Sequence, residues 1–313
     1  MDNEAEDYFN ELDIDDEDEI KNDIVINIED YYTVLKILGS GAYGTVYQVK
    51  SHKDNQIYAL KMMNEKLEQV VLKDIEREYE VLKILGDKCK QGLVCYHKLF
   101  KGRYKGTNLI GTHTYICLLM DYIQGFELFD YVNDECITKN KWLNEDQMFT
   151  VMKHLAYTVK LLHDNNIVHR DIKAKNIIIN GTQMVLIDYG FLCSVKNINI
   201  PDIDLGCFDN KGTPLYLSPE LYQIIFSGQK IQIPGKVLKA ADVWALGVVF
   251  YLIITCEFPF RGFDPSNDGI KQFYNFLRKG DLQKSQYNFI NGMLETDFKK
   301  RLTINDVYKI LDR

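Results

Sequence analysis

The chain has 313 residues, of which 46% are hydrophobic and 12% aromatic, enough for a sizeable folded core. Its formal net charge of −8 is concentrated near one end, because residues 1–19 include eleven Asp or Glu and no Lys or Arg. The remainder has 34 acidic residues against 37 Lys and Arg, with no dense basic stripe, which argues against a nucleic-acid-binding protein.

Residues 1–28 are predicted to form an acidic disordered tail, because charge repulsion opposes packing. This tail lacks the basic and apolar regions of a secretory signal. The longest apolar run, Val243 to Cys256, has 14 residues and favours a buried core helix over a membrane span. Seven scattered cysteines favour neither a disulfide framework nor a zinc site. We therefore expect a soluble monomer in a reducing compartment, cytoplasmic or nuclear, without a membrane partner.

The elements expected along the chain fall into two groups. Strand-like patterns come first, over residues 32–40, 45–50, 57–62, 93–100 and 115–123. One helix is expected among them, over residues 72–85. After Gly125 helical patterns prevail, the longest from Asn144 to Asp164. We therefore expect an α+β fold in two lobes with a cleft between them, a small β-rich lobe with one helix (29–122) and a larger helical lobe (123–313).

A glycine-rich segment lies between the first two predicted strands. It comprises Gly39, Ser40, Gly41, Ala42, Tyr43, Gly44, Thr45 and Val46. Three glycines would let backbone N–H groups approach phosphate oxygens closely. The segment lacks the Gly-Lys-Ser/Thr of a Walker loop, and no helix follows as in a dinucleotide-binding motif. A plain glycine-rich hairpin is the alternative.

Lys61 and Glu78 form a predicted ion pair. Lys61 ends an apolar strand, and Glu78 lies on the apolar face of the helix 72–85, between Ile75 and Leu82. A carboxylate that faces a core needs a partner. Lys61 is the plausible cation, and the pair would fix it against phosphates. A solvated lysine at the end of a strand is the alternative.

Two further segments combine polar groups suited to phosphate chemistry. In HRDIKAKN, Asp171 lies between Arg170 and Lys173, with Asn176 five residues further on. A solvated turn could have this composition, as could a site that activates a hydroxyl and holds a metal. The apolar strand Met184–Ile187 leads to Asp188, across a short hairpin from Asn176. Convergent Asn and Asp oxygens are suitable ligands for Mg²⁺.

In this order, the motifs resemble those of the protein kinase family. They are Gly39-x-Gly41-x-x-Gly44-x-Val46, Ala59-Leu60-Lys61, Glu78, His169-Arg170-Asp171 with Asn176, and Asp188-Tyr189-Gly190. The segments 212–220 (GTPLYLSPE), 242–247 (DVWALG) and 258–260 (FPF), together with Arg301, extend the resemblance to the C-terminus. The resemblance implies one bilobal kinase domain over residues 29–313.

The resemblance also implies a role for each candidate residue. Asp171 would be the catalytic base and Lys173 would support the γ-phosphate of ATP, while Asn176 and Asp188 would hold Mg²⁺ or Mn²⁺. Lys61, fixed by Glu78, would engage the α- and β-phosphates. The adenosine would contact Val46, Ala59, Met120, Asp121, Ile123, Glu127 and Ile178. The substrate platform would comprise Thr213, Asp242 and a buried ion pair between Glu220 and Arg301.

Other features of the resemblance concern the acceptor and departures from the family. Lys173 and the GTPLY segment are typical of serine/threonine kinases. Tyr189 replaces the usual Phe and should pack similarly, with a hydroxyl to satisfy. Lys175 stands where an acid often helps to read basic substrates, and so weakens that preference. Residues 227–238 are interpreted as an inserted loop.

We therefore expect an active serine/threonine protein kinase that uses Mg·ATP and a protein substrate. A pseudokinase that serves as a binding module or scaffold is the main alternative, and a small-molecule kinase is a second. No Ser, Thr or Tyr lies between Ser194 and Thr213. By resemblance, Asp209 could pair with Arg170 as a fixed anion, which predicts activity without activation-loop phosphorylation. An exposed loop aspartate is the alternative.

Overall fold

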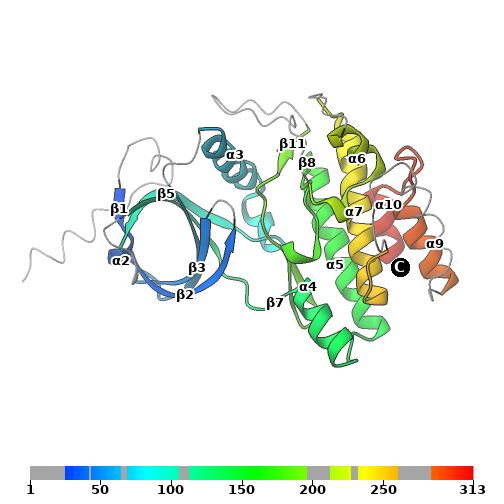
Figure 1. Cartoon of the computed structure of the whole chain (residues 1–313), viewed down its shortest axis with the longest axis horizontal. Helices are drawn as coiled ribbons and strands as arrows, with labels where there is room; N and C mark the ends of the chain where they lie inside the picture. Colours follow the sequence, from blue (N-terminus) through cyan, green and yellow to red (C-terminus); the bar gives the residue numbers. More distant parts are fainter. Residues whose placement is uncertain are drawn as a thin grey trace, which may run out of the picture. The chain divides into compact units, whose positions relative to one another are not determined.

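Figure 1 shows a computed structural model of the chain. The structure describes residues 25–41, 44–64, 69–105, 113–195, 212–226, 232–259 and 283–312. The chain divides into two compact units. The first contains the described residues up to Leu72 together with Cys95–Tyr122, and the second contains Lys73–Val94 and the described residues from Ile123 onward. The first unit is rich in β-strands and the second is mainly helical, which confirms the predicted α+β class.

A six-stranded sheet forms the first unit, in the order β1-β5-β6-β4-β3-β2. Its strands are β1 (Val25–Asn27), β2 (Tyr32–Gly41), β3 (Gly44–Ser51), β4 (Ile57–Asn64), β5 (Tyr96–Tyr104) and β6 (His113–Asp121). β1 pairs with β5 in parallel and every other pair is antiparallel. The strands predicted from Tyr32 onward are therefore confirmed, with shifted boundaries.

Apolar side chains on one face of this sheet form its core. The cluster contains Ile28, Val49, Leu60, Met62, Phe100, Cys117 and Leu119. In β4, Leu60 and Met62 alternate with Ala59 and Lys61, and successive side chains of a strand point to opposite faces. Ala59 and Lys61 therefore lie on the face opposite this cluster.

The sequence predicts a disordered tail up to residue 28, and over residues 25–28 this prediction is wrong. Val25–Asn27 pairs with β5, and Ile28, the first residue of the short helix α2 (Ile28–Tyr31), is fully buried. A Cβ atom on Gly102 would lie 2.7 Å from Ile28 Cγ1, so this glycine leaves room for the isoleucine. A three-residue strand is too short to show a clear alternating pattern. Residues 1–24 lie outside the described part of the chain.

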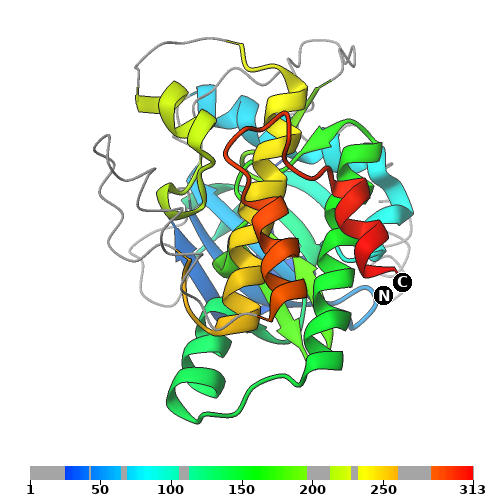
Figure 2. The same cartoon turned by 90° about the vertical axis from the view of Figure 1, so that its right-hand side faces the viewer.

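Helices dominate the second unit. They are α4 (Leu128–Tyr131), the π-helix η2 (Val132–Thr138), α5 (Glu145–Asp164), α6 (Pro219–Phe226), α7 (Gly235–Thr255), α9 (Lys284–Met293) and α10 (Ile304–Leu311). Helix α3 (Gln69–Leu85) begins in the first unit and ends in the second. Helix α7 packs against both α5 and α9, and α10 packs against α5; Figure 2 shows these four helices together.

The predicted helix from Asn144 to Asp164 is confirmed as α5. Asn144 caps it: its side chain accepts the Gln147 backbone N–H, and the Gln147 side chain accepts the Asn144 N–H. This reciprocal capping box satisfies two backbone donors at the start of the helix. Apolar residues at helical spacing, among them Leu155, Val159 and Leu162, are buried.

The predicted buried helix is also confirmed, as part of α7. Within the described residues, α7 is the one helix long and apolar enough by length and composition to cross a membrane. In the most apolar 18-residue stretch of this helix, 83% is buried inside the protein, as expected for a core helix. The helix begins at Gly235, so the predicted loop over 227–238 is wrong for residues 235–238. Pro234 precedes this start with φ −59°, a backbone angle suited to entering a helix.

Small strands and short 3₁₀ helices connect the helices of the second unit. The strands are β7 (Phe126–Glu127), β8 (Ile167–Val168), β9 (Ile177–Asn180), β10 (Gln183–Leu186) and β11 (Cys193–Ser194). The 3₁₀ helices are η1 (Gly86–Lys90), η3 (Ala174–Asn176) and η4 (Pro214–Tyr216). The strands form two sheets, in the orders β10-β9-β7 and β11-β8.

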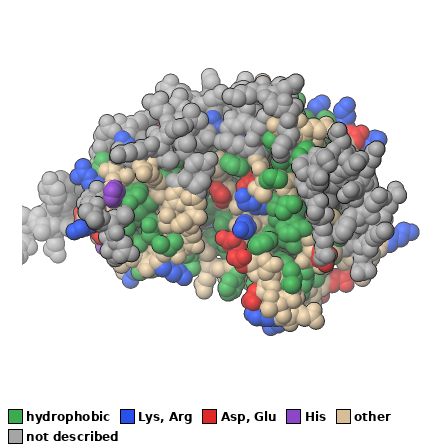
Figure 3. Space-filling model, viewed as in Figure 1, with side chains coloured by type: hydrophobic (Ala, Val, Ile, Leu, Met, Phe, Trp, Pro, Cys, Tyr) green, Lys and Arg blue, Asp and Glu red, His purple; other side chains and the backbone are tan. Residues whose placement is uncertain are grey.

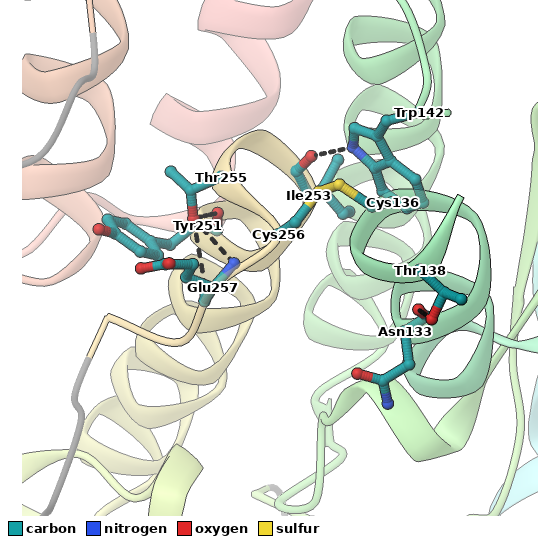
Figure 4. The surroundings of a disulfide bond; sticks show 9 residues. All are labelled: Asn133, Cys136, Thr138, Trp142, Tyr251, Ile253, Thr255, Cys256 and Glu257. Carbon is teal, nitrogen blue, oxygen red and sulfur yellow. Dashed lines mark hydrogen bonds between the residues drawn. A yellow bond between two sulfur atoms is a disulfide. The ribbon is translucent and has the colours of Figure 1, made fainter. Parts of the chain in front are cut away.

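A disulfide joins Cys136 of η2 to Cys256, the residue that caps the end of α7 (Figure 4). The two Cα atoms lie 6.3 Å apart although 120 positions separate the residues in sequence. Cys89, Cys95 and Cys193 are disulfide-bonded as well. The expectation of no disulfide framework is therefore wrong, because spacing along the chain does not reveal pairs made by folding. The cysteine-based argument for a reducing compartment loses its basis.

Candidate active site

The segment that carries Asp171 is held by a carboxylate from α7. The backbone N–H groups of His169 and Arg170 donate to Asp242 Oδ2 and Oδ1, at 2.9 and 2.8 Å. Arg170 has φ 71°, a left-handed conformation that a non-glycine residue adopts only when its surroundings hold it. Asp242 supplies that restraint, because both of its oxygens are bonded to this backbone.

Asp242 is itself 2% exposed, so its charge requires compensation. His163 of α5 provides part of it, with Nε2 3.0 Å from Asp242 Oδ2. Burial acts to raise the pKa of the Asp242 carboxyl, but the hydrogen bond and charge of His163 outweigh it, with help from His169. The pKa therefore lies below its ordinary value of 3.8. The carboxylate form is the one that holds the catalytic segment.

Three groups converge on the Asp171 side chain. Lys173 Nζ lies 2.5 Å from Oδ2, which also accepts a hydrogen bond from Asn176 Nδ2 at 3.1 Å. The Thr213 hydroxyl donates to Oδ1 at 2.7 Å. Lys173 Nζ also lies 3.2 Å from Thr213 Oγ1, so the lysine connects the two groups. The structure thus brings together the predicted group of Asp171, Lys173 and Asn176, and adds the Thr213 hydroxyl, whose contact with Asp171 the sequence did not predict.

Asn176 and Asp188 lie at the same end of the β9–β10 hairpin. Ile177 pairs with Leu186, and the Ile187 N–H donates to Asn176 O at 2.8 Å. Because both hydrogen bonds of Asn176 Nδ2 go to Asp171, its Oδ1 is left as the atom available to a cation. Asp188 is exposed and has φ 63°.

These two side chains fit a magnesium site. One carboxylate and one amide oxygen are what Mg²⁺ takes from a protein when phosphate and water supply its other ligands. Within the described residues, no group of three or more His, Cys, Asp or Glu residues is placed to hold a metal ion. The donor set therefore suits a metal that is shared with a phosphate rather than one enclosed by protein.

The glycine-rich segment lies at the turn between β2 and β3 in the first unit. Gly41 pairs with Gly44, and Ser40 Oγ lies 3.1 Å from Thr45 Oγ1. A Cβ atom on Gly39 or Gly41 would meet nothing within 4 Å, whereas one on Gly44 would lie 2.2 Å from Met62 O. Gly44 is thus required by the neighbouring strand, and open space lies beside Gly39 and Gly41. Ala42 and Tyr43 lie outside the described residues.

Lys61 belongs to a group of side chains on one face of this sheet. Opposed residues of antiparallel strands share a face, and Lys61 is opposed to Val46 and Leu118. Ala59 is likewise opposed to Met120. Strand β2, which leads to the glycines, has exposed apolar residues, among them Ile37. Figure 3 shows hydrophobic side chains at the surface over β2 and β3.

Glu78 lies in the second unit, where it is buried. A Cβ atom on Gly190 would lie 3.7 Å from Glu78 Oε2 and 3.5 Å from Asp188 Oδ1, so this glycine lies beside two carboxylates. Lys61 belongs to the other unit, and its ion pair with Glu78 stays a prediction.

The residues predicted around adenosine are divided between the units. Met120 and Asp121 end β6 in the first unit, where Asp121 Oδ1 lies 2.6 Å from His97 Nε2. In the second unit Glu127 is opposed to Ile178 in the β7–β9 pair, and Ile123 is half-buried. Burial and then Asp130 raise the pKa of Glu127 above its ordinary value, against the opposing charge of Lys175.

The predicted platform ion pair forms within the second unit. Arg301 donates to both carboxylate oxygens of Glu220, and the central carbon of its planar guanidinium lies 5.0 Å from the Trp244 ring centroid. Thr213 directly precedes η4, a few positions before Glu220 in sequence, and its hydroxyl contacts Asp171 as described above. Asp209, the anion predicted to pair with Arg170, lies outside the described residues. Within them, Arg170 Nη1 lies 3.8 Å from Cys193 Sγ.

Two residues that support the site, Tyr216 and His163, were not predicted from the sequence. The Tyr216 hydroxyl accepts the Ala174 N–H at 3.3 Å and so ties η4 to the segment after Asp171. His163, the partner of Asp242, lies on the buried face of α5. A histidine at a core position of an amphipathic helix could have signalled a buried polar partner, but not which one.

The comparisons with known proteins agree with this geometry. The family model described as protein kinase domain matches residues 32–310. A serine/threonine-protein kinase of Drosophila erecta is 27% identical over 301 residues, which cover 91% of this chain and 35% of the relative. Serine/threonine-protein kinase DCLK3 of Mus musculus is 26% identical over 303 residues, with coverage of 92% and 33%.

A probable serine/threonine-protein kinase of Dictyostelium discoideum is 28% identical over 291 residues, which cover 91% of this chain and 56% of the relative. The chain thus spans about a third of the length of the first two relatives and about half of the third. Since the family model covers most of the chain, this chain belongs to the protein kinase family.

Proposed function

We propose that this chain is an active serine/threonine protein kinase that transfers the γ-phosphate of Mg·ATP to a protein hydroxyl. The observation that carries the proposal is the Thr213 hydroxyl, which donates to Asp171 Oδ1 at 2.7 Å. This contact has the chemistry that a substrate serine or threonine needs, an alcohol O–H directed at a carboxylate. The names of the relatives, all serine/threonine-protein kinases, support the same acceptor class.

In the proposed reaction, Asp171 takes the proton of the substrate hydroxyl. The O–H bond breaks as the new O–P bond forms, and the bond between the γ-phosphorus and the bridging oxygen breaks with its electron pair left on ADP. Lys173, in contact with Asp171, is placed to offset the negative charge of the transferred group. Asn176 and Asp188 would hold Mg²⁺, which when bound neutralises charge on the phosphate oxygens.

The first unit would supply most of the nucleotide contacts. Open space beside Gly39 and Gly41 suits the approach of phosphate oxygens to backbone N–H groups. Lys61, with Glu78 as its proposed partner, would engage the α- and β-phosphates. Adenosine would contact Val46, Ala59, Met120, Asp121, Ile123, Glu127 and Ile178. We also propose that the chain is a monomer and that it binds neither nucleic acid nor a membrane.

The test is phosphate transfer by the purified chain to a generic protein substrate, with Mg²⁺ and labelled ATP. Phosphoamino-acid analysis should recover phosphoserine or phosphothreonine and no phosphotyrosine. Asp171→Asn should lower kcat roughly a hundredfold or more, because it removes the base with little change in size. Asp146→Asn, at an exposed aspartate in the first turn of α5, is the matched control and should keep the wild-type rate. Nucleotide binding without transfer by the wild type would instead identify a pseudokinase.

A further inference from the structure

Tyr189, the residue after Asp188, is completely buried in the second unit. Its ring meets the His169 ring edge-on, with the centroids 5.5 Å apart and the planes at 61°. A phenol O–H in such a place requires hydrogen-bond partners, since an unsatisfied buried hydroxyl is unfavourable. The identities of those partners show what the hydroxyl does.

The hydroxyl connects two backbone segments. It donates to Leu186 O at 2.5 Å and accepts the Val94 N–H at 2.9 Å. Leu186 is the last residue of β10, and Leu93 forms an isolated parallel bridge with it. The phenol therefore closes the turn from Leu186 to Tyr189 and fastens it to the segment around Val94. Asp188 lies within that turn.

Asp188 is the residue of this turn that needs support. Its φ of 63° is left-handed, which is unfavourable for a residue with a side chain and persists only where the surroundings impose it. The Asp188 carboxylate is exposed, and the Gly190 N–H is a long 3.4 Å from its Oδ1. The direction in which the Asp188 carboxylate points is thus set mainly by the conformation of the Asp188 backbone.

We infer that the Tyr189 hydroxyl is a positioning group that holds the backbone of Asp188 in the conformation required for its role. This inference rests on the proposed function, in which Asp188 holds Mg²⁺. A phenylalanine at 189 would keep the ring packing against His169. The Val94 N–H would keep an acceptor, because Leu186 O lies 3.3 Å from it. Tyr189→Phe therefore removes the tie without leaving a buried backbone donor unpaired.

The first measurement is amide hydrogen exchange on the nucleotide-free protein. The Ile187 N–H donates to Asn176 O and the Leu192 N–H to Tyr189 O, so both amides report on this turn. In Tyr189→Phe both should exchange about fivefold faster or more, the effect of one lost buried hydrogen bond. Amides in α7 should keep their wild-type rates. Tyr157→Phe, which removes an α5 hydroxyl bonded to Gln91, is the matched control and should change neither reporter.

The second measurement is the Mg²⁺ concentration that gives half-maximal phosphate transfer. Tyr189→Phe should raise it several-fold, whereas Tyr157→Phe should not. Unchanged exchange at Ile187 and Leu192 in the folded variant would overturn the tie, and faster exchange with an unchanged Mg²⁺ requirement would overturn the positioning of Asp188.

The exchange experiment needs no catalysis, so it separates this inference from the proposed function. A wild-type chain that fails to transfer phosphate refutes the proposed function and the role assigned to Asp188, while the exchange rates still decide whether the tie exists. If Tyr189→Phe does not fold, NMR of the wild type labelled at tyrosine replaces it. The Tyr189 hydroxyl proton should then exchange slowly with solvent, and rapid exchange would overturn the tie.

Discussion

The guanidinium group of Arg301 donates two hydrogen bonds to the carboxylate of Glu220, at 2.7 and 2.9 Å, across 81 positions of sequence. The Arg301 side chain is fully buried and that of Glu220 is 13% exposed. Arg301 also donates to the backbone oxygens of Ala240 and Glu295. The pair therefore joins α6, α7 and the segment before α10, and its loss would leave a buried charge without compensation.

Arg301→Ala should lower the free energy of unfolding by about 3–5 kcal/mol, the usual effect of removing one partner of a buried ion pair. Urea denaturation monitored by circular dichroism measures this loss. Lys300→Ala is the neighbouring control: its side chain is 75% exposed and Nζ lies 3.7 Å from Asp297. That change should lower the stability by less than about 1 kcal/mol. Similar losses in the two variants would contradict the importance of the Arg301 pair.

Asp188→Asn should remove Mg²⁺-dependent transfer and leave the fold intact. The change takes away the negative charge that a hard cation requires and hardly alters the size of an exposed side chain. We expect kcat to fall roughly a hundredfold or more, with the thermal midpoint unchanged. Single-turnover assays across a Mg²⁺ series measure this. Near wild-type phosphate transfer by this variant at any Mg²⁺ concentration would show that Asp188 is not a ligand of the metal.

His169 should make stability depend on pH below neutrality. Burial lowers the pKa of His169 below its ordinary value of 6.5, more than Asp242, Asp171 and Asp188 raise it. The unfolded chain therefore binds a proton more readily than the folded protein. The contribution of His169 is complete above about pH 6.5 and is lost as the pH falls through its lower folded pKa.

Urea denaturation between pH 7.5 and 5 should accordingly show a falling free energy of unfolding, with a shallower slope in His169→Gln. His154→Gln, at an exposed position of α5, should keep the wild-type slope. The lowered pKa of Asp242 acts in a separate window, because its stabilisation is lost only below about pH 3.8. Identical slopes in the wild type and His169→Gln would contradict the assignment.

The Cys136–Cys256 disulfide should contribute to stability by restricting the unfolded chain. Its loop spans 120 positions of sequence, and a bridge across so long a loop stabilises by about 2–5 kcal/mol. Cys136→Ser, Cys256→Ser and the double variant should lose equal amounts, because each removes the same bond. Chemical denaturation of the three variants without reductant tests this. Additive losses in the double variant would show that the two cysteines act separately.

Asp209 is proposed as a permanent anion for Arg170. Phosphatase-treated wild type should keep its kcat, because residues 195–212 contain no hydroxyl side chain to phosphorylate. Asp209→Ala should lower kcat at least several-fold, while Asp204→Ala, another acid of the same segment, should not. Steady-state assays after phosphatase treatment measure both. A phosphatase-sensitive wild type, or full activity in Asp209→Ala, would refute this regulation.

Local sequence pattern was sufficient to predict strands β2 to β6 and helices α3, α5 and α7. Alternation in β2 to β4, helical spacing in α5 and the unbroken apolar run of α7 each depend on neighbours along the chain. The approach of Asn176 to Asp188 was predictable for the same reason, because a short hairpin joins them. Boundaries were less accurate, since strand β1 and the start of α7 are set by packing partners rather than by their own residues.

Apart from the Glu220–Arg301 pair, which the family resemblance implies, only the tertiary structure shows which distant groups meet. Asp242 holds the backbone of Arg170 from 72 positions away, and the Tyr189 hydroxyl reaches Val94 across 95. The left-handed conformations of Arg170 and Asp188 follow from those contacts, and the pairing of Cys136 with Cys256 from the meeting of η2 with the end of α7. Propensity and periodicity describe a residue among its sequence neighbours, whereas these contacts depend on how complete elements pack.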